Sequence, residues 1–115
     1  MRVQILSPYR GHDPADTRRN VAYAYAAIRD CLDGGDAPFA PHLIYPAVLD
    51  DSYPADRAAG IGAGLQWLAA ADVVAVYTDL GISDGMRAEL AEADRLGIPI
   101  IHRSLSGWAP PGPRG

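Results

Sequence analysis

The stretch Val73-Val74-Ala75-Val76-Tyr77 decides the fold. Five apolar residues in a row, three of them valine, predict a strand that is covered on both faces. The segment Ile82-Ser83-Asp84-Gly85 follows and is typical of a loop that leads into a helix, with Ser83 suited to cap it. Gly97 suits the position just after that helix, and a second apolar run comes next. Strand, helix and strand in this order predict a parallel sheet.

The rest of the chain continues this alternation. We expect strands at 2–6, 38–45 and 98–102, and helices from 16 or 17 to 32, from 55 to 71 and from about 83 to 96. Three glycines between 60 and 64 weaken the prediction of the second helix. The expected fold class is α/β: a small doubly wound, flavodoxin- or Rossmann-like domain with a parallel sheet of about four to five strands and helices on both faces. We assign residues 1–105 to this domain and 106–115 to a Pro/Gly-rich tail, poorly ordered beyond Trp108.

Composition excludes several classes of function. The chain has 115 residues, which is enough for one hydrophobic core. Its net charge of −4 gives no broad electrostatic footprint for nucleic acid. A single cysteine, Cys31, excludes an internal disulfide and a cysteine-based zinc site, and we expect its side chain to be buried. No apolar run reaches membrane-spanning length and no signal-peptide pattern opens the chain, so we expect a cytoplasmic protein without cofactor or metal.

Glu89 is a carboxylate on the apolar side of its predicted helix. With Met86 at zero and about 100° per residue, Leu90 falls at about 40° and Ala93 at about 340°. Glu89 falls at about 300°, inside this stripe. Because an ionised carboxylate facing a core costs free energy, Glu89 either has a buried partner, such as an arginine, or faces a pocket.

Two predicted loops meet at the carboxyl edge of the sheet, where ligands bind in such folds. The loop after the first strand carries Ser7, Tyr9 and Arg10, and the helix that follows the third strand begins with Ser83 and Gly85. A helix start with free amides favours an anion, an arginine fork suits phosphate, and a tyrosine can stack on a base or sugar. A plain helix cap and an exposed loop arginine are the alternatives.

Glu89 comes six residues after Ser83, roughly 9 Å along the helix axis. This spacing suits a ribose placed between a bound phosphate and a reacting C1′ carbon. A carboxylate there is suited to act as a nucleophile at an anomeric carbon. His42 is a candidate acid, base or stacking partner, although a lone histidine on a strand is more often structural. Asp50 and Asp51 fall in a loop, and the glycines from 60 to 64 follow no strand, so they are not a dinucleotide fingerprint.

The pattern Ser83-x-Gly85-x-x-x-Glu89-Leu90-x-x-Ala93, preceded by Trp67-Leu68-x-x-Ala71-Asp72-Val73-Val74, resembles the nucleoside 2-deoxyribosyltransferase superfamily. That group includes N-glycosidases of deoxynucleoside 5′-monophosphates. Ser7-Pro8-Tyr9-Arg10-Gly11 resembles its first phosphate- or sugar-binding loop, and residues 39–45 resemble small bacterial and phage members. The similarity covers roughly residues 2 to 102.

The resemblance implies that Glu89 attacks C1′ and releases the base. It also implies a nucleotide ligand, because serine at position 83 is similar to the monophosphate hydrolases, whereas the transferases carry an aspartate that would repel phosphate. The implied binding residues are Ser7, Tyr9, Arg10, Gly11, Ser83, Gly85 and Met86. The second catalytic aspartate of the family aligns near Gly64, where this chain has no acid, and the third phosphate-binding serine has no clear match. The candidate substitutes for that aspartate are His42, Asp50, Asp51, Asp56 and Asp79.

The leading hypothesis is an N-glycosidase or deoxyribosyltransferase that acts on a nucleoside 5′-monophosphate. The alternatives are a non-catalytic nucleotide-binding or sensing module on the same fold and, third, a partner-binding domain without a small-molecule site. The expected partner is a small nucleotide or nucleoside, not nucleic acid or a membrane. We also expect a homo-oligomer, a dimer or larger, since the family is generally oligomeric and a pocket this small needs a neighbouring subunit to close it.

Overall fold

The structure is a computed structural model that describes residues 1–111. A four-stranded parallel sheet forms the centre of the molecule. The strand order is β2-β1-β3-β4, with β1 at Arg2–Leu6, β2 at Ala37–Phe39, β3 at Val73–Tyr77 and β4 at Ile100–Arg103. Strand β1 pairs with β2 on one side and with β3 on the other, all in parallel register. The predicted fold class is therefore confirmed, at the lower end of the expected number of strands.

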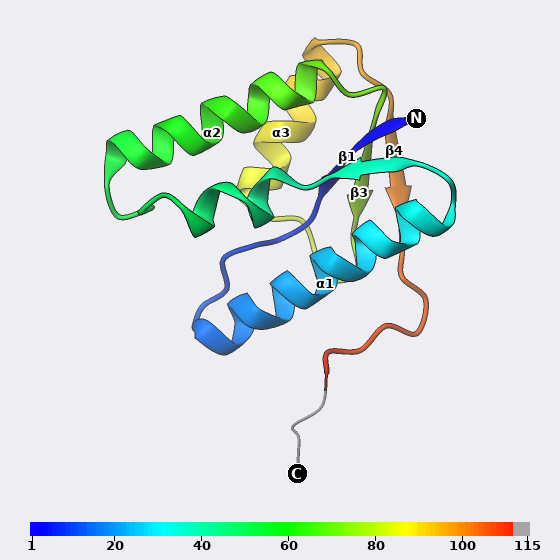
Figure 1. Ribbon diagram of the computed structural model, residues 1–115, viewed down its shortest axis with the longest axis horizontal. Coiled ribbons are helices and arrows are strands. Elements are labelled where there is room, and N and C mark those ends of the chain that lie inside the picture. The colour runs from blue at the N-terminus through cyan, green and yellow to red at the C-terminus, as the bar shows by residue number, and fades with distance from the viewer. Residues whose placement is uncertain (112–115) are drawn as a thin grey trace.

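Helices cover both faces of this sheet (Figure 1). Helix α1, Pro14–Asp33, packs Tyr23, Ala27 and Cys31 against one face. Helices α2, Pro54–Ala69, and α3, Asp84–Arg95, cover the other face with Leu68, Met86 and Ala93. All five residues of β3 are buried, as the apolar run predicts, because the sheet is sandwiched between these two layers. Cys31 is fully buried, as expected.

The segment predicted as a long second strand is mostly helical turn, so that prediction is wrong beyond Phe39. Strand β2 ends there, and two 3₁₀ turns follow, η1 at Pro41–Leu43 and η2 at Tyr45–Ala47. The prolines that open the two turns have no N–H group to donate to a strand ladder. The amides of Leu43 and Ile44 instead bond to carbonyls three residues back, each at 3.0 Å.

The start of the first helix differs from the prediction because its capping residue determines where the helix begins. Helix α1 begins at Pro14 because the Asp13 carboxylate accepts the Asp16 amide at 2.8 Å, which places a proline in the first turn. Helix α3 ends as predicted, with Gly97 at a φ of 73° just beyond the cap. Leu96 is the cap residue of this helix and is exposed. Strand β4 begins two residues later than predicted, after Pro99.

The chain after β4 returns to the sheet and packs on the α1 side. The ring of Trp108 meets the ring of Tyr23 edge to face, with centroids 5.0 Å apart. Asp79, in the loop after β3, accepts hydrogen bonds from Tyr23, from Ser104 and from the Leu105 amide, which fastens this segment. The rest of the predicted poorly ordered tail, 112–115, lies outside the described residues. No helix within 1–111 is both long and apolar enough to cross a membrane.

Candidate active site

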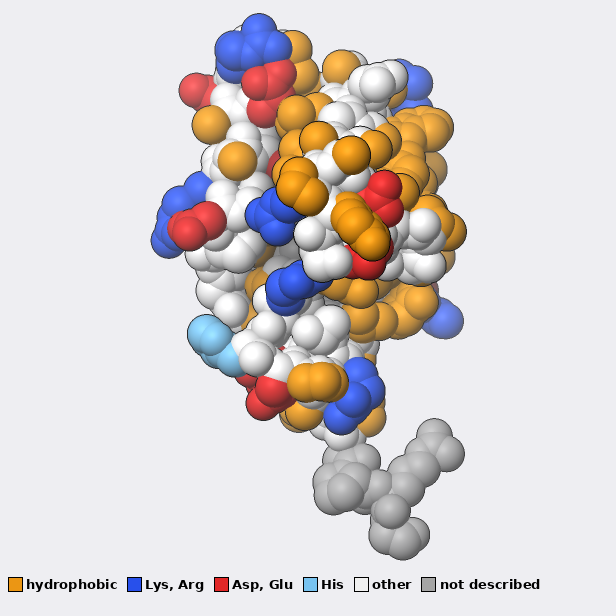
Figure 2. Space-filling model, turned by 90° about the vertical axis from the view of Figure 1, so that its left-hand side faces the viewer, with side chains coloured by type: hydrophobic (Ala, Val, Ile, Leu, Met, Phe, Trp, Pro, Cys, Tyr) orange, Lys and Arg blue, Asp and Glu red, His pale blue; other side chains and the backbone are white. Residues whose placement is uncertain are grey.

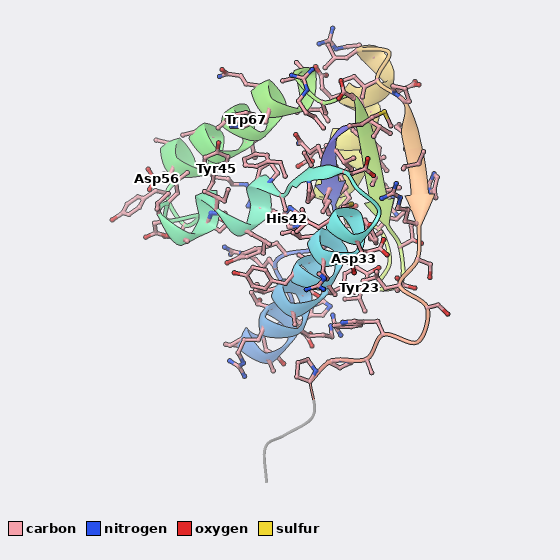
Figure 3. All side chains as sticks on the ribbon, turned by 45° about the vertical axis from the view of Figure 1, so that its right-hand side comes forward. Tyr23, Asp33, His42, Tyr45, Asp56 and Trp67 are labelled. Atoms are coloured by element: carbon pink, nitrogen blue, oxygen red, sulfur yellow. The ribbon has the colours of Figure 1, made fainter. Side chains whose placement is uncertain are left out.

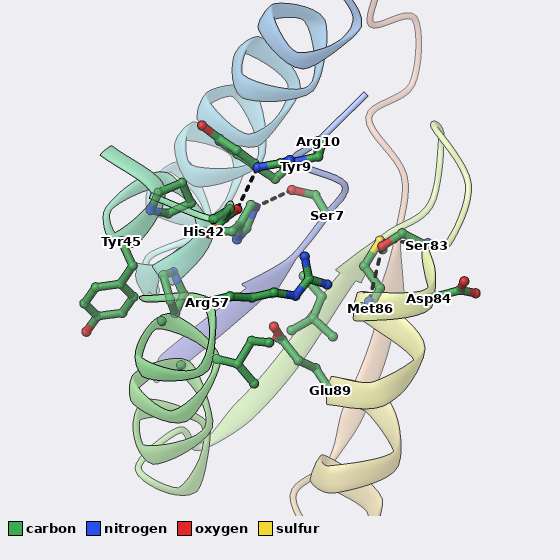
Figure 4. A pocket seen from close by; sticks show the side chains of 18 of the residues that line it. Ser7, Tyr9, Arg10, His42, Tyr45, Arg57, Ser83, Asp84, Met86 and Glu89 are labelled. Atoms are coloured by element: carbon green, nitrogen blue, oxygen red, sulfur yellow. Dashed lines mark hydrogen bonds and ion pairs between the residues drawn. The ribbon is translucent and has the colours of Figure 1, made fainter. Parts of the chain in front are cut away.

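A cavity of about 420 Å³ opens at the carboxyl edge of the sheet, between α2 and α3 (Figure 4). Three parts of the chain form most of its wall: the loop after β1, the η1–η2 turns with the start of α2, and the first turns of α3. The chain passes from β1 to β2, which pairs with one edge of β1, and later to β3, which pairs with the other edge of β1. The cavity thus lies at the switch in strand order, where this fold class binds ligands.

Glu89 extends from α3 into this cavity. Its carboxylate makes no hydrogen bond or ion pair with any other residue of the described part of the chain. Burial raises the pKa of Glu89 to about 7, because the charged form loses part of its hydration there. A carboxylate with such a pKa in a cleft is a common property of functional sites.

The start of α3 presents unused amides to the same cavity. The hydroxyl of Ser83 accepts the Met86 amide at 3.2 Å, which caps the helix. The Asp84 and Gly85 amides precede that bond and have no acceptor within the described chain. The Asp84 side chain points away from the cavity and pairs with Arg87 at 3.1 Å. The helix end therefore offers free N–H groups and a partial positive charge to an anion.

Ser7 and His42 form a pair on the opposite wall. The Ser7 hydroxyl and His42 Nε2 are 2.8 Å apart, and Ser7 is buried at the end of β1. Burial lowers the pKa of His42 to about 4, so the imidazole is neutral at pH 7. A neutral imidazole has one donor and one acceptor nitrogen, so it can orient Ser7 or a ligand without adding charge.

The arginines of the cavity differ in their partners. Arg10 pairs with Asp51 across the cavity mouth at 2.9 Å. Arg57 projects from the first turn of α2 into the cavity, and its guanidinium faces Glu89 (Figure 4). Its side chain makes no ion pair within residues 1–111.

The comparisons with known proteins give a family and a fold. The family model described as "Domain of unknown function (DUF7768)" matches residues 1–103. The chain belongs to this family. A search of curated proteins returned no match.

Among solved structures, the chain is similar to a 2-deoxyribosyltransferase from the psychrotolerant bacterium Bacillus psychrosaccharolyticus. The TM-score is 0.65 at 20% sequence identity, over 95% of this chain and 76% of that protein. This likeness shows a shared fold.

The structure brings most of the predicted site residues to this one cavity. Those that line it are Ser7, Tyr9, Arg10, His42, Asp51, Ser83, Gly85, Met86 and Glu89.

Four predicted residues do not line the cavity. Gly11 packs against the start of α1, where a Cβ atom would come 2.1 Å from that of Asp16, so only glycine fits. Asp50 is exposed and accepts hydrogen bonds from Ser52. Asp79 fastens the segment after β4, and these bonds hold its pKa at about 2, below the usual range. Asp56 likewise turns to the loop, accepting the Asp50 amide.

Sequence reasoning missed the contribution of α2. Arg57, Gly60, Ile61 and Gly64 are spaced i, i+3, i+4 and i+7, which is one face of a helix, and all four line the cavity. That spacing was visible in the sequence, but two glycines on the face hide the usual apolar signal. Gly60 also gives room to the segment after η2, since a Cβ atom at Gly60 would lie only 3.2 Å from the Leu49 side chain.

Within the described residues, no three His, Cys, Asp or Glu side chains gather as metal ligands would.

Proposed function

We propose that the chain is an N-glycosidase or deoxyribosyltransferase-like enzyme that cleaves the base–sugar bond of a nucleoside 5′-monophosphate, with Glu89 as the nucleophile. The observation that carries the proposal is the Glu89 carboxylate, which is partly buried in a cavity whose other end is a helix N-terminus and has no partner within residues 1–111. A carboxylate is costly in such a place unless it serves a ligand.

The anion end of the cavity favours a phosphate. The two free amides of α3, the Ser83 hydroxyl and the helix dipole all favour negative charge. Arg10 supports this end only if it exchanges its partner, since it is paired with Asp51. The Arg10 side chain is largely exposed, and a pair of this kind contributes at most about 1 kcal/mol, so a phosphate can compete with Asp51 for the guanidinium.

The distance along α3 fits a sugar. Six residues separate Ser83 from Glu89, or about 9 Å along the helix axis. A nucleotide bound with its phosphate at the helix start therefore places its sugar beside Glu89. His42 and Tyr9 then lie on the wall opposite the phosphate site, where they are suited to contact sugar or base.

The reaction proceeds through two displacements at C1′. A Glu89 oxygen forms a bond to C1′ as the C1′–N bond breaks, and the bonding electron pair leaves with the base. Water, or a second base, then attacks C1′ and the electron pair of the ester bond returns to Glu89. With water, the proton released neutralises the departed base, giving free base and deoxyribose 5-phosphate.

The fold likeness supports this class of chemistry, because a 2-deoxyribosyltransferase has the same fold. Because one fold hosts many activities, we infer the activity from the residues of the cavity.

Base release is the decisive assay. The protein is incubated with purine and pyrimidine nucleoside 5′-monophosphates, in ribo and deoxy forms, and with the matching free nucleosides, and the free base is separated by chromatography. We expect release from at least one monophosphate, faster than from its nucleoside. Release from no compound would contradict the proposal.

A second candidate is a nucleotide-binding or sensing module without turnover. It is favoured by one observation: position 64 is a buried glycine whose carbonyl accepts Gln4 at 3.3 Å, so no acid stands where the resemblance expects one. This candidate predicts that monophosphates raise the melting temperature while no base is released.

A further inference from the structure

Arg57 is the charged group of the cavity that the two displacements at C1′ leave without a role. It belongs to the cavity-facing stripe of α2 and is the only charged member of that stripe, with Gly60, Ile61 and Gly64 as its neighbours. Its guanidinium extends across the cavity toward Glu89 (Figure 4).

The departing base needs help that no carboxylic acid in the cavity supplies. Of the three carboxylates that line it, Asp51 is paired with Arg10 at 2.9 Å, and Asp84 points outward to Arg87. The third is Glu89 itself, which cannot both attack C1′ and protonate the leaving group. The His42 imidazole is neutral and held by Ser7, so it is a weak proton source at pH 7.

The geometry of displacement places the leaving group on the α2 side. A nucleophile attacks C1′ from the face opposite the bond that breaks, so a base attacked from α3 departs away from α3. The wall across from Glu89 at this depth is the stripe of α2, and its donor group is the Arg57 guanidinium.

We infer that Arg57 binds the departing base and carries its developing negative charge, and that the substrate is a pyrimidine nucleotide with a carbonyl oxygen beside the glycosidic nitrogen. This rests on the proposed function. As the C1′–N bond breaks, its electron pair spreads from the ring nitrogen onto that oxygen. The guanidinium fork donates two parallel hydrogen bonds to such an edge, and water supplies the proton afterwards. Preorganised charge of this kind replaces an acid.

Leaving-group sensitivity tests this role directly. Base release is measured for wild type and Arg57→Ala with deoxyuridine 5′-monophosphate and with its 5-fluorouracil counterpart, whose base departs more readily as an anion. We expect Arg57→Ala to lower kcat about 100-fold with uracil and about 10-fold with fluorouracil. Added guanidinium ion should restore part of the uracil rate. Arg18→Ala, an exposed arginine of α1, is the matched control and should match wild type.

A binding experiment distinguishes contacts of Arg57 with the base from contacts with the phosphate, without any turnover. Calorimetry with Glu89→Gln and the double variant Glu89→Gln/Arg57→Ala compares deoxyuridine 5′-monophosphate with deoxyribose 5-phosphate. Loss of Arg57 should weaken the nucleotide and leave the sugar phosphate unchanged. Equal weakening of both would make Arg57 a phosphate ligand and overturn the inference.

Other outcomes also overturn the inference. An equal loss of rate with both bases, or release of purines only, would remove the leaving-group role while the proposed function stands. A shift of the acid limb of the kcat/KM profile to higher pH, without base dependence, would mean that Arg57 acts on the ionisation of Glu89 instead. No release from any nucleotide by wild type would be a failure of the proposed function itself.

Discussion

At the scale of single residues, the raised pKa of Glu89 makes the stability of the fold depend on pH. Its pKa is about 7 in the folded chain, against an ordinary value of 4.5. Between these two pH values the folded chain retains a proton that the unfolded chain has lost. The contribution of Glu89 to stability is therefore fully present below pH 4.5 and is lost as pH rises through 7.

Glu89→Gln should stabilise the protein at high pH. Glutamine does not titrate, so the variant should exceed wild type at pH 8 by on the order of 2 kcal/mol, and the difference should vanish near pH 4. Urea unfolding at the two pH values measures this. Glu92→Gln is the matched control, because Glu92 is on the same helix, pairs with Arg95 and has a lowered pKa, so it should give no stabilisation. A pH-independent difference for Glu89→Gln would contradict the raised pKa.

At the scale of elements, both α2 and α3 were predictable as helices, but only in α3 was the side that faces the cavity predictable. The six-residue step from cap to carboxylate is read directly from the sequence, because α3 has one apolar stripe, a serine cap and a glycine stop. In α2 the face that meets the cavity consists of Arg57, Ile61 and two glycines, which carries no periodic apolar signal. The turns after β2 were missed because Pro41 converts an apolar strand pattern into a 3₁₀ turn.

The η1 turn, which the sequence did not predict, also positions His42. In an extended strand, His42 would continue along the edge of the sheet beyond Phe39. The turn at Pro41 brings its ring to Ser7 at the carboxyl end of β1, from 35 residues away in sequence. Figure 3 shows the neighbouring Tyr45, which the same turns bring to Trp67 of α2, with a hydrogen bond of 2.7 Å. A contact between segments this distant cannot be read from local pattern.

The cap of α3 should set the choice between nucleotide and nucleoside. Asparagine and aspartate cap a helix about as well as serine, so Ser83→Asn and Ser83→Asp should both fold. The aspartate should weaken binding of a nucleoside 5′-monophosphate about 10- to 100-fold through charge repulsion, and leave the free nucleoside unaffected. Calorimetry on the matched pair isolates the charge. Equal monophosphate affinities in the two variants would show that the phosphate does not bind at this helix start.

At the scale of the whole molecule, one side carries an exposed apolar surface. Figure 2 shows hydrophobic side chains gathered on the side that holds the start of α2. The large exposed members over the turns and α2 are Ile44, Val48, Tyr53, Ile61 and Trp67. This surface borders the cavity, because Ile61 belongs to both. Apolar surface of this kind supports our expectation of an oligomer that closes the site.

Light scattering coupled to size-exclusion chromatography tests the oligomer. We expect a multiple of the 12.2 kDa chain mass, reduced to that of one chain by Val48→Asp, since Val48 is 76% exposed and would be buried between copies. Arg29→Asp, on the exposed surface of α1, controls for added negative charge and should keep the oligomer. A wild-type mass of about 12 kDa would contradict the expectation.

The sequence predicts the sheet because continuous apolar runs mark its central strands, and it predicts the spacing from Ser83 to Glu89 because both residues belong to one helix and its cap. It also names Ser7 and His42, but it does not predict their contact or the presence of Arg57, because these arise only through tertiary packing.

The proposed mechanism requires that Glu89 forms a covalent bond to C1′ of the substrate. The most direct measurement is mass spectrometry of the protein quenched during turnover of the best monophosphate from the release assay, with peptide mapping of any added mass, beside Glu89→Gln. This mechanism predicts that one sugar phosphate is added to the peptide at Glu89. It also predicts that the Glu89→Gln variant neither carries the adduct nor releases base. An adduct on another residue, or base release by Glu89→Gln at the wild-type rate, would contradict it.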